Sequence, residues 1–225
     1  MNDSLRLLSA SDEARVRDAI IAAEARTEAE IIPVITPASG RYDRAEDLFG
    51  VVCALVLVGA LHLGFQSFSV DAWGQVTATM PLWGYLLAFL VSFLIGAALA
   101  SHFTVLRLPF ITRAEMDAEV ERRAMEAFFR FRLRATDGAS GVLLFISLHE
   151  HRVRVFGDDG VARHLDQSDW DAVCARVVET IRGGDLAGGV VEGVRLLGDT
   201  LAPHLPRKAD DQNELEDSVR YMEAP

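Results

Sequence analysis

Lysine and cysteine are almost absent from this sequence. Lys208 is the only lysine among the 22 basic residues, and Cys53 and Cys174 are the only cysteines. One cysteine lies in a long apolar stretch and the other in an expected soluble helix, so neither a disulfide framework nor a thiolate metal site follows. Basic charge is also short overall, since the formal net charge is −11. We therefore exclude nucleic acid as a partner, because phosphate contacts need a basic face.

The residue patterns of common catalytic sites are missing as well. The sequence has no Gly-rich phosphate loop of the Walker type and no Cys-x5-Arg. His149, His151 and His164 lack the spacing and the fourth partner that a zinc site needs. Cleavage of a phosphomonoester would require a nucleophile or a metal-bound water, together with groups that stabilise the developing charge. The residues by themselves thus do not predict an enzyme.

Charge is nearly absent from residues 48–106, where Asp71 is the only charged side chain. Residues 48–70 and 72–106 are each long enough to cross a bilayer, which takes about 20 apolar residues in a helix. The alternative is a pair of buried helices in a soluble core, but soluble helices normally keep a charged face. We therefore predict a transmembrane helical hairpin joined by a short polar connector. The predicted hairpin covers residues 45–108, with spans at about 48–68 and 80–106.

Small residues recur at intervals of four within both predicted spans. This spacing lets helix backbones approach closely in lipid. We interpret the small residues as packing within the hairpin, and pairing between two copies of the chain is the alternative. The residues concerned are Gly50, Ala54, Ala60 and Gly64 in the first span, and Ser92, Gly96 and Ala100 in the second.

The two flanks of the hairpin predict parts of one interrupted α/β domain. Residues 30–36 form a near-continuous apolar run typical of a strand buried on both faces, and Pro33 within it favours an edge or a bulge. Each flank alone has too few strands for a sheet. The predicted domain combines residues 1–44 and 109–205, followed by an acidic, mobile tail at 206–225. The expected elements are helices at about 9–27, 112–134, 168–183 and 186–201, and strands at 30–36, 141–148 and 151–156.

The soluble flanks resemble the TPM domain, a family named for a thylakoid-lumen protein, a photosystem II repair protein and a nematode acetylcholine-receptor modulator. The likeness rests on an ordered set of short motifs. These are Thr27-Glu28-Ala29-Glu30-Ile31 for T-x-x-E-I, Gly141-Val142-Leu143-Leu144 with Arg152-Val153-Arg154-Val155 for the family's hairpin, the loop Gly157-Asp158-Asp159-Gly160, and Gly183-Gly184-Asp185 before the last helix. The tail segment Asp211-Gln212-Asn213-Glu214-Leu215 resembles a terminal element of bacterial members with a membrane hairpin at this place.

The resemblance implies a small three-layer α/β/α sandwich with the hairpin inserted. It also implies a possible cation site, because some family members bind calcium or magnesium through loop carboxylates and some are reported as phosphatases. This chain departs from the family pattern, since Ala139-Ser140 stands where the family often has Asp-Asn. The residues that remain as candidate ligands for calcium or magnesium are Asp137, Asp158 and Asp159, with Glu30 from the family match. The alternative is that these aspartates are solvated turn residues.

Arginines predict the orientation of the hairpin. Arg41 and Arg44 precede the first span, Arg107 and Arg113 follow the second, and the connector has no lysine or arginine. Because cytoplasmic flanks carry the excess of basic residues, both termini and the α/β domain are expected in the cytosol, at a bacterial inner membrane. The first ten residues lack the apolar core of a secretory signal, which agrees with this orientation.

These observations leave two functional hypotheses. The first is a membrane-anchored, non-catalytic module that binds or assists another membrane protein, or a second copy of the chain, on the cytosolic side. The second is a metal-dependent phosphoester hydrolase. The altered Asp-Asn position favours the first hypothesis.

Overall fold

The computed structural model describes residues 7–66, 80–208 and 214–225, apart from the side chains of Gln66, Thr104, Ala135 and Asp137. The chain divides into two compact units. One unit combines Met1–Arg41 with Met116–Pro225, and the other is Tyr42–Glu115. The first unit is therefore built from both flanks of the long apolar stretch.

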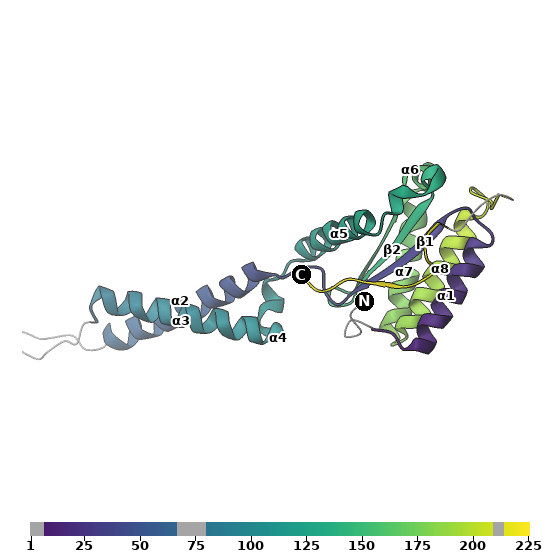
Figure 1. Cartoon of the computed structure of the whole chain (residues 1–225). Helices are drawn as coiled ribbons and strands as arrows, with labels where there is room; N and C mark the ends of the chain where they lie inside the picture. The colour runs from purple at the N-terminus through teal and green to yellow at the C-terminus, as the bar shows by residue number, and fades with distance from the viewer. Residues whose placement is uncertain (1–6, 67–79, 209–213) are drawn as a thin grey trace, which may run out of the picture. The chain divides into compact units, whose positions relative to one another are not determined.

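A four-stranded sheet forms the centre of the first unit, in the order β3-β2-β1-β4 (Figure 1). Strand β1 (Glu30–Thr36) pairs in parallel with β2 (Gly141–Ser147), which forms an antiparallel hairpin with β3 (Arg152–Gly157). Because β1 precedes the apolar stretch and β2 follows it, neither flank contains the sheet by itself. The expected strand at 30–36 agrees with β1, and the expected strand at 141–148 is one residue longer than β2. The inner residues of both strands are apolar, and both strands are buried along their whole length.

The prediction of a mobile tail is wrong for its last part. Strand β4 (Arg220–Tyr221) pairs in parallel with Val34 and Ile35 of β1. The N–H of Met222 donates to the carbonyl of Ile35 at 3.0 Å, and the Met222 side chain is 1% exposed. A strand of two residues within an acidic segment has too few apolar positions to show a period of two, so the pattern did not indicate it. Residues 209–213 lie outside the described part of the chain.

Pro33 occupies a position in β1 that needs no hydrogen-bond donor. The N–H of Glu30 points toward β2, where it donates to the carbonyl of Ser140 at 3.2 Å. Backbone direction alternates along a strand, so the nitrogen of Pro33 faces the other side. On that side β4 pairs only with Val34 and Ile35. The expectation that Pro33 marks an edge strand is wrong, because β1 lies between β2 and β4. Proline is tolerated there because the short β4 does not pair with Pro33.

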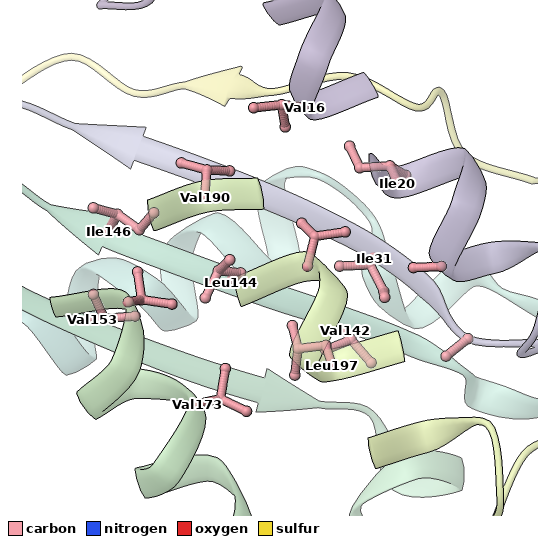
Figure 2. Packing of buried hydrophobic residues seen from close by; sticks show 14 of the residues in the cluster. Val16, Ile20, Ile31, Val142, Leu144, Ile146, Val153, Val173, Val190 and Leu197 are labelled. Carbon is pink, nitrogen blue, oxygen red and sulfur yellow. The ribbon is translucent and has the colours of Figure 1, made fainter. Parts of the chain in front are cut away.

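Helices cover both faces of the sheet (Figure 1). One face carries α1 (Ala10–Glu24), α7 (Gln167–Arg182) and α8 (Leu186–Leu201), and the other carries α5 (Arg113–Arg130). Figure 2 shows the first of these cores, in which Val16 and Ile20 of α1 and Leu197 of α8 point at the side chains of the sheet. The expected three-layer α/β/α arrangement is thus confirmed.

Glycine allows close packing of α8, and a capping box fixes the start of α7. An added Cβ on Gly193 of α8 would lie 2.7 Å from both Leu144 Cδ2 and Val177 Cγ2, so only glycine lets α8 approach β2 and α7 this closely. The capping box of α7 consists of Asp166 and Asp169. The sequence analysis expected this helix to begin at about residue 168, with Ser168 and Asp171 at the same spacing of three, whereas the cap lies two residues earlier.

Two long apolar helices, α2 (Asp43–Gln66) and α3 (Leu82–His102), make up most of the second unit. Both are long and apolar enough to cross a membrane, and only 11% of each apolar stretch is buried within the structure. Helix α3 ends four residues before the predicted limit, because Phe103 takes extended backbone angles (φ −111°, ψ 94°) before the short α4 (Thr104–Arg107). The polar connector predicted between the spans falls mostly on residues 67–79, which lie outside the described residues.

Small residues pack α2 against α3. An added Cβ on Gly96 would lie 3.0 Å from the Cα of Gly50, while Ala54 and Ala100 are 0% exposed. The predicted packing within the hairpin is confirmed at these four residues. Gly64 has open space around it, so the second small pair of the first span contributes nothing to this contact.

Candidate functional site

Asp158, one of the predicted cation ligands, lies directly after β3 and begins the short helix α6 (Asp159–Ala162). Its Oδ1 accepts the N–H of Asp159 at 2.8 Å, which makes Asp158 the N-cap of the helix. The side chain is 6% exposed, and the nearest positive charge is Arg134, whose Nε lies 3.7 Å from Oδ1. The carboxylate thus has a structural role as a cap and an arginine as its counter-charge.

The two loops that carry the predicted aspartates are neighbours. Helical turn η4 (Asp137–Ala139) lies against Gly160, where an added Cβ would be 2.2 Å from the carbonyl oxygen of Gly138. Gly138 itself has a φ of 75°, a backbone conformation that favours glycine. The two loops therefore meet at one end of the sheet.

The described carboxylates at this end do not form a cation site by themselves. Asp159 is exposed, Asp158 is engaged as above, and the side chain of Asp137 lies outside the described part of the chain. Among the described residues, no group of three histidine, cysteine, aspartate or glutamate side chains has the geometry to hold a metal ion. That Asp137, Asp158 and Asp159 together bind a cation stays a prediction.

A buried cluster of acidic side chains lies at the start of β1. Oε1 of Glu24 accepts the N–H of Ile31 at 2.9 Å, and Glu24 is 9% exposed. Burial raises the pKa of Glu24 to about 9, the Ile31 N–H opposes this rise, and the charges of Glu30 and Asp217 add to it. Glu24 is consequently protonated at neutral pH and able to donate a hydrogen bond to a carboxylate.

Glu30 in this cluster holds the C-terminal segment. Its two carboxylate oxygens accept the N–H groups of Glu214 at 3.1 Å and Leu215 at 3.3 Å. Glu30 is 6% exposed. The family resemblance indicated Glu30, but the sequence analysis treated it as a candidate cation ligand and did not identify Glu24 or Asp217. The structure instead shows a carboxylate that binds backbone N–H groups and so fixes the end of the chain to β1.

Two serines and a glutamate meet at the opposite end of the sheet. The Ser147 hydroxyl donates to Oε2 of Glu150 and lies 2.7 Å from the Ser39 hydroxyl. The N–H groups of Ser39 and Gly40 approach Oε1 of Glu150 at 3.0 and 3.3 Å. Ser147 is 1% exposed and Ser39 is 0% exposed, so a substrate does not reach either hydroxyl. This network joins the loop after β1 to the β2–β3 turn and is not a nucleophilic site.

A hollow follows the outer edge of β3. Its volume is about 490 Å³, and we call it the β3 groove. Within the described residues β3 is the end strand of the sheet, and its antiparallel register turns the backbone groups of Val153, Val155 and Gly157 away from β2. The groove is lined by Glu121 of α5, residues 154–157 of β3, Ala162 of α6, and Gln167, Trp170, Asp171 and Cys174 of α7.

The charge of the β3 groove is negative. Arg154 is paired with Asp117 at 3.1 Å, and the same carboxylate pairs with Arg152 at 2.9 Å, so one net positive charge remains against the two carboxylates of Glu121 and Asp171. Asp171 accepts a hydrogen bond from Gln167 at 2.9 Å. In the described part of the chain, neither Asp171 nor the exposed Glu121 has a cationic partner. Phe156 and Trp170 add aromatic surface. Such a combination suits a basic side chain, because carboxylates and aromatic faces both attract cations.

Cys174 in this groove is not a nucleophile. Burial raises the pKa of its thiol to about 11, so the reactive thiolate is scarce at neutral pH. The groove was not predictable from the sequence. The alternating pattern at residues 151–156 indicated a half-exposed strand, but the groove also needs α5 and α7, which are brought to β3 only by the fold.

Comparisons with known proteins agree with this fold. Residues 102–200 match the family model of the TPM domain. The NMR structure of the BA42 protein from the psychrophilic bacterium Bizionia argentinensis is similar, with a TM-score of 0.57 and 18% sequence identity, over 99% of this chain and 100% of that chain. At this identity the likeness concerns the fold alone. No protein with a curated description matches the chain.

Proposed function

We propose that this chain, which contains a TPM domain, is a membrane-anchored binding module. Helices α2 and α3 would cross a bacterial inner membrane, and the α/β unit would face the cytosol. There the β3 groove would take up an extended, basic segment of another membrane protein. The single observation that carries the binding role is the groove itself, in which two carboxylates without a cationic partner among the described residues lie beside the outer edge of β3.

The anchoring role is supported by the surface of the two helices. A core helix of a soluble protein is mostly buried, whereas Leu63, Leu82 and Trp83 of this hairpin are 71%, 75% and 69% exposed. Water is a poor solvent for such a surface and lipid is a good one. At one end of the hairpin Arg107 is paired with Glu46 at 2.5 Å, and both side chains are less than one-fifth exposed. The pair keeps both charges satisfied next to the apolar stretch.

A short basic peptide tests the groove. We expect the full chain in detergent micelles to bind fluorescent acetyl-Lys-Val-Lys-Val-Lys-amide, and E121Q/D171N to weaken this binding about fivefold, which corresponds to two partly exposed charge pairs. The matched control is E119Q/E179Q, which removes one exposed carboxylate from each of α5 and α7 that already pairs with arginine. Fluorescence polarisation measures both. An equal loss in the two double variants would show non-specific attraction and contradict a specific groove.

Cysteine labelling tests the orientation. In a chain with Cys53 and Cys174 replaced by alanine, we expect Q75C to react with a membrane-impermeant maleimide in intact bacterial cells. R207C should react only after the cells are permeabilised. The reason is that the basic residues on both sides of the hairpin favour the cytosol. Labelling of R207C, and not of Q75C, in intact cells would invert the orientation and place the groove outside.

The second candidate function, a metal-dependent phosphoester hydrolase, has one supporting observation, the meeting of the two aspartate loops. A calcium titration separates it from the binding module. We expect millimolar calcium or magnesium to leave the melting temperature unchanged, because Arg134 already provides the positive charge next to Asp158. A rise that is lost in D158N/D159N would support the hydrolase instead. Asparagine keeps the helix cap, so this variant tests the charge and not the fold.

A further inference from the structure

The end of α5 and the following turn carry a run of alternating aromatic and basic residues. Arg130, Arg132 and Arg134 fall within five positions and are all exposed. Phe129 is 62% exposed, and Met125, one helical turn earlier, is 48% exposed. We call these five residues the Arg–Phe patch. It stands out in a chain whose formal net charge is −11.

The charges of the Arg–Phe patch are largely unneutralised, unlike those of its neighbours. Earlier on the same helix, Arg122 is paired with Glu119 and Arg123 with Glu126, each at 2.6 Å. By contrast, Arg130 and Arg132 have no carboxylate within ion-pair distance among the described residues. The Arg130 guanidinium instead lies 6.0 Å from the centre of the Phe131 ring. Arg134 lies 3.7 Å from Asp158 and is 58% exposed.

The backbone at Arg132 is left-handed, with a φ of 58°. This position follows the last turn of α5, where glycine is the usual residue because it lacks the Cβ that strains this conformation. The sequence therefore places an arginine at a position whose local structure favours glycine. Departures of this kind are expected where the side chain serves a function.

We propose that the Arg–Phe patch binds the surface of a membrane that contains anionic phospholipids. This inference rests on the proposed anchoring of the chain, which keeps a bilayer surface within reach. Guanidinium groups form paired hydrogen bonds with phosphate oxygens, and exposed aromatic and thioether side chains enter the interfacial region of a bilayer. A soluble polyanion would pair with the arginines and leave Phe129 and Met125 in water, whereas a lipid surface binds both kinds of side chain.

Hydrogen exchange of the full chain in lipid nanodiscs tests the proposal. We expect the amides of residues 129–134 to exchange several-fold more slowly in phosphatidylcholine discs containing phosphatidylglycerol than in discs of phosphatidylcholine alone. R130Q/R132Q should remove this difference. The control R122Q/R176Q, which changes two exposed and already paired arginines, should keep it. The variant R132G removes one guanidinium while relieving the backbone, so a smaller difference in this variant is not explained by misfolding.

Each remaining outcome decides the question. Equal exchange in the two kinds of disc would overturn the proposal. Equal slowing by inorganic phosphate or polyglutamate in neutral discs would show that the patch binds polyanions and not a lipid surface.

Resistance of the protein–disc complex to an alkaline wash measures anchoring separately. If the chain fails to enter the discs, the anchoring proposal is wrong. Flotation with vesicles of the same two compositions then tests the patch, since binding to the anionic vesicles must be lost in R130Q/R132Q.

Discussion

Replacing Glu24 with glutamine is expected to raise the stability of the chain at pH 8 and to flatten its pH dependence. The pKa of Glu24 is raised from an ordinary 4.5 to about 9 in the folded state, chiefly by burial. Between these values the folded chain holds a proton that the unfolded chain has lost. Stability from this group is therefore complete below about pH 4.5 and is lost as the pH rises toward 9. The slope for one proton is at most about 1.4 kcal/mol per pH unit.

Glutamine mimics the protonated carboxyl of Glu24. Its carbonyl oxygen still accepts the Ile31 N–H, and its amide still donates to a neighbouring carboxylate. At pH 8 the gain should be on the order of 3 kcal/mol, reduced from the single-site limit because Glu30 and Asp217 are coupled to Glu24. Thermal melting in a mild detergent at pH 5 and pH 8 measures the effect. E179Q, on the exposed face of α7, is the control and should keep the pH profile of the original chain. Parallel profiles for E24Q and the original chain would contradict the assignment.

We expect a folded, soluble protein when a short Gly-Ser linker joins residues 1–41 to residues 116–225. The joined chain contains all four strands and the helices on both faces of the sheet. Residues 116–225 alone lack β1, which lies between β2 and β4. They lose four apolar side chains, Ile31, Ile32, Val34 and Ile35, that are at most 2% exposed. Burial of these four contributes about 6–12 kcal/mol, which is comparable to the whole stability of a domain of this size.

Thermal and urea melting measure the stability of both chains. The joined chain should melt in one cooperative transition, while residues 116–225 alone should show none. A joined chain without a cooperative transition would mean that the apolar hairpin is needed for the fold. A cooperative transition of the shorter fragment at the same temperature would mean that β1 is dispensable.

Elements with a continuous apolar run or a clear helical period were predictable from the sequence. The bounds of β1 and α8 agree with the structure to the residue. In each case the local pattern, the flanking turn residues and the burial all favour the same structure. The three-layer fold followed from the order of these elements together with the family resemblance.

The missed features depend on residues that are distant in the sequence. Glu24 reads as a solvated charge at the end of an amphipathic helix, and only the return of the C-terminal segment buries it. Strand β4 is too short to show a period, and its pairing depends on β1. The β3 groove needs Glu121 of α5 and Asp171 of α7, which lie far apart in the sequence. No window of the sequence contains either arrangement.

The order of the strands along the chain also determines the order of events on the ribosome. Strand β1 is synthesised early, but its partner β2 follows roughly a hundred residues later, which is about 5–20 s at ordinary rates of translation. During that time β1 has no neighbouring strand, while the two apolar helices are being made. Strand β4 is synthesised after the other three strands, so the sheet is completed last on the β4 side of β1. A prematurely terminated chain would leave Glu30 and the Met222 site without their partners, which makes truncated products recognisable to proteases by their incomplete sheet.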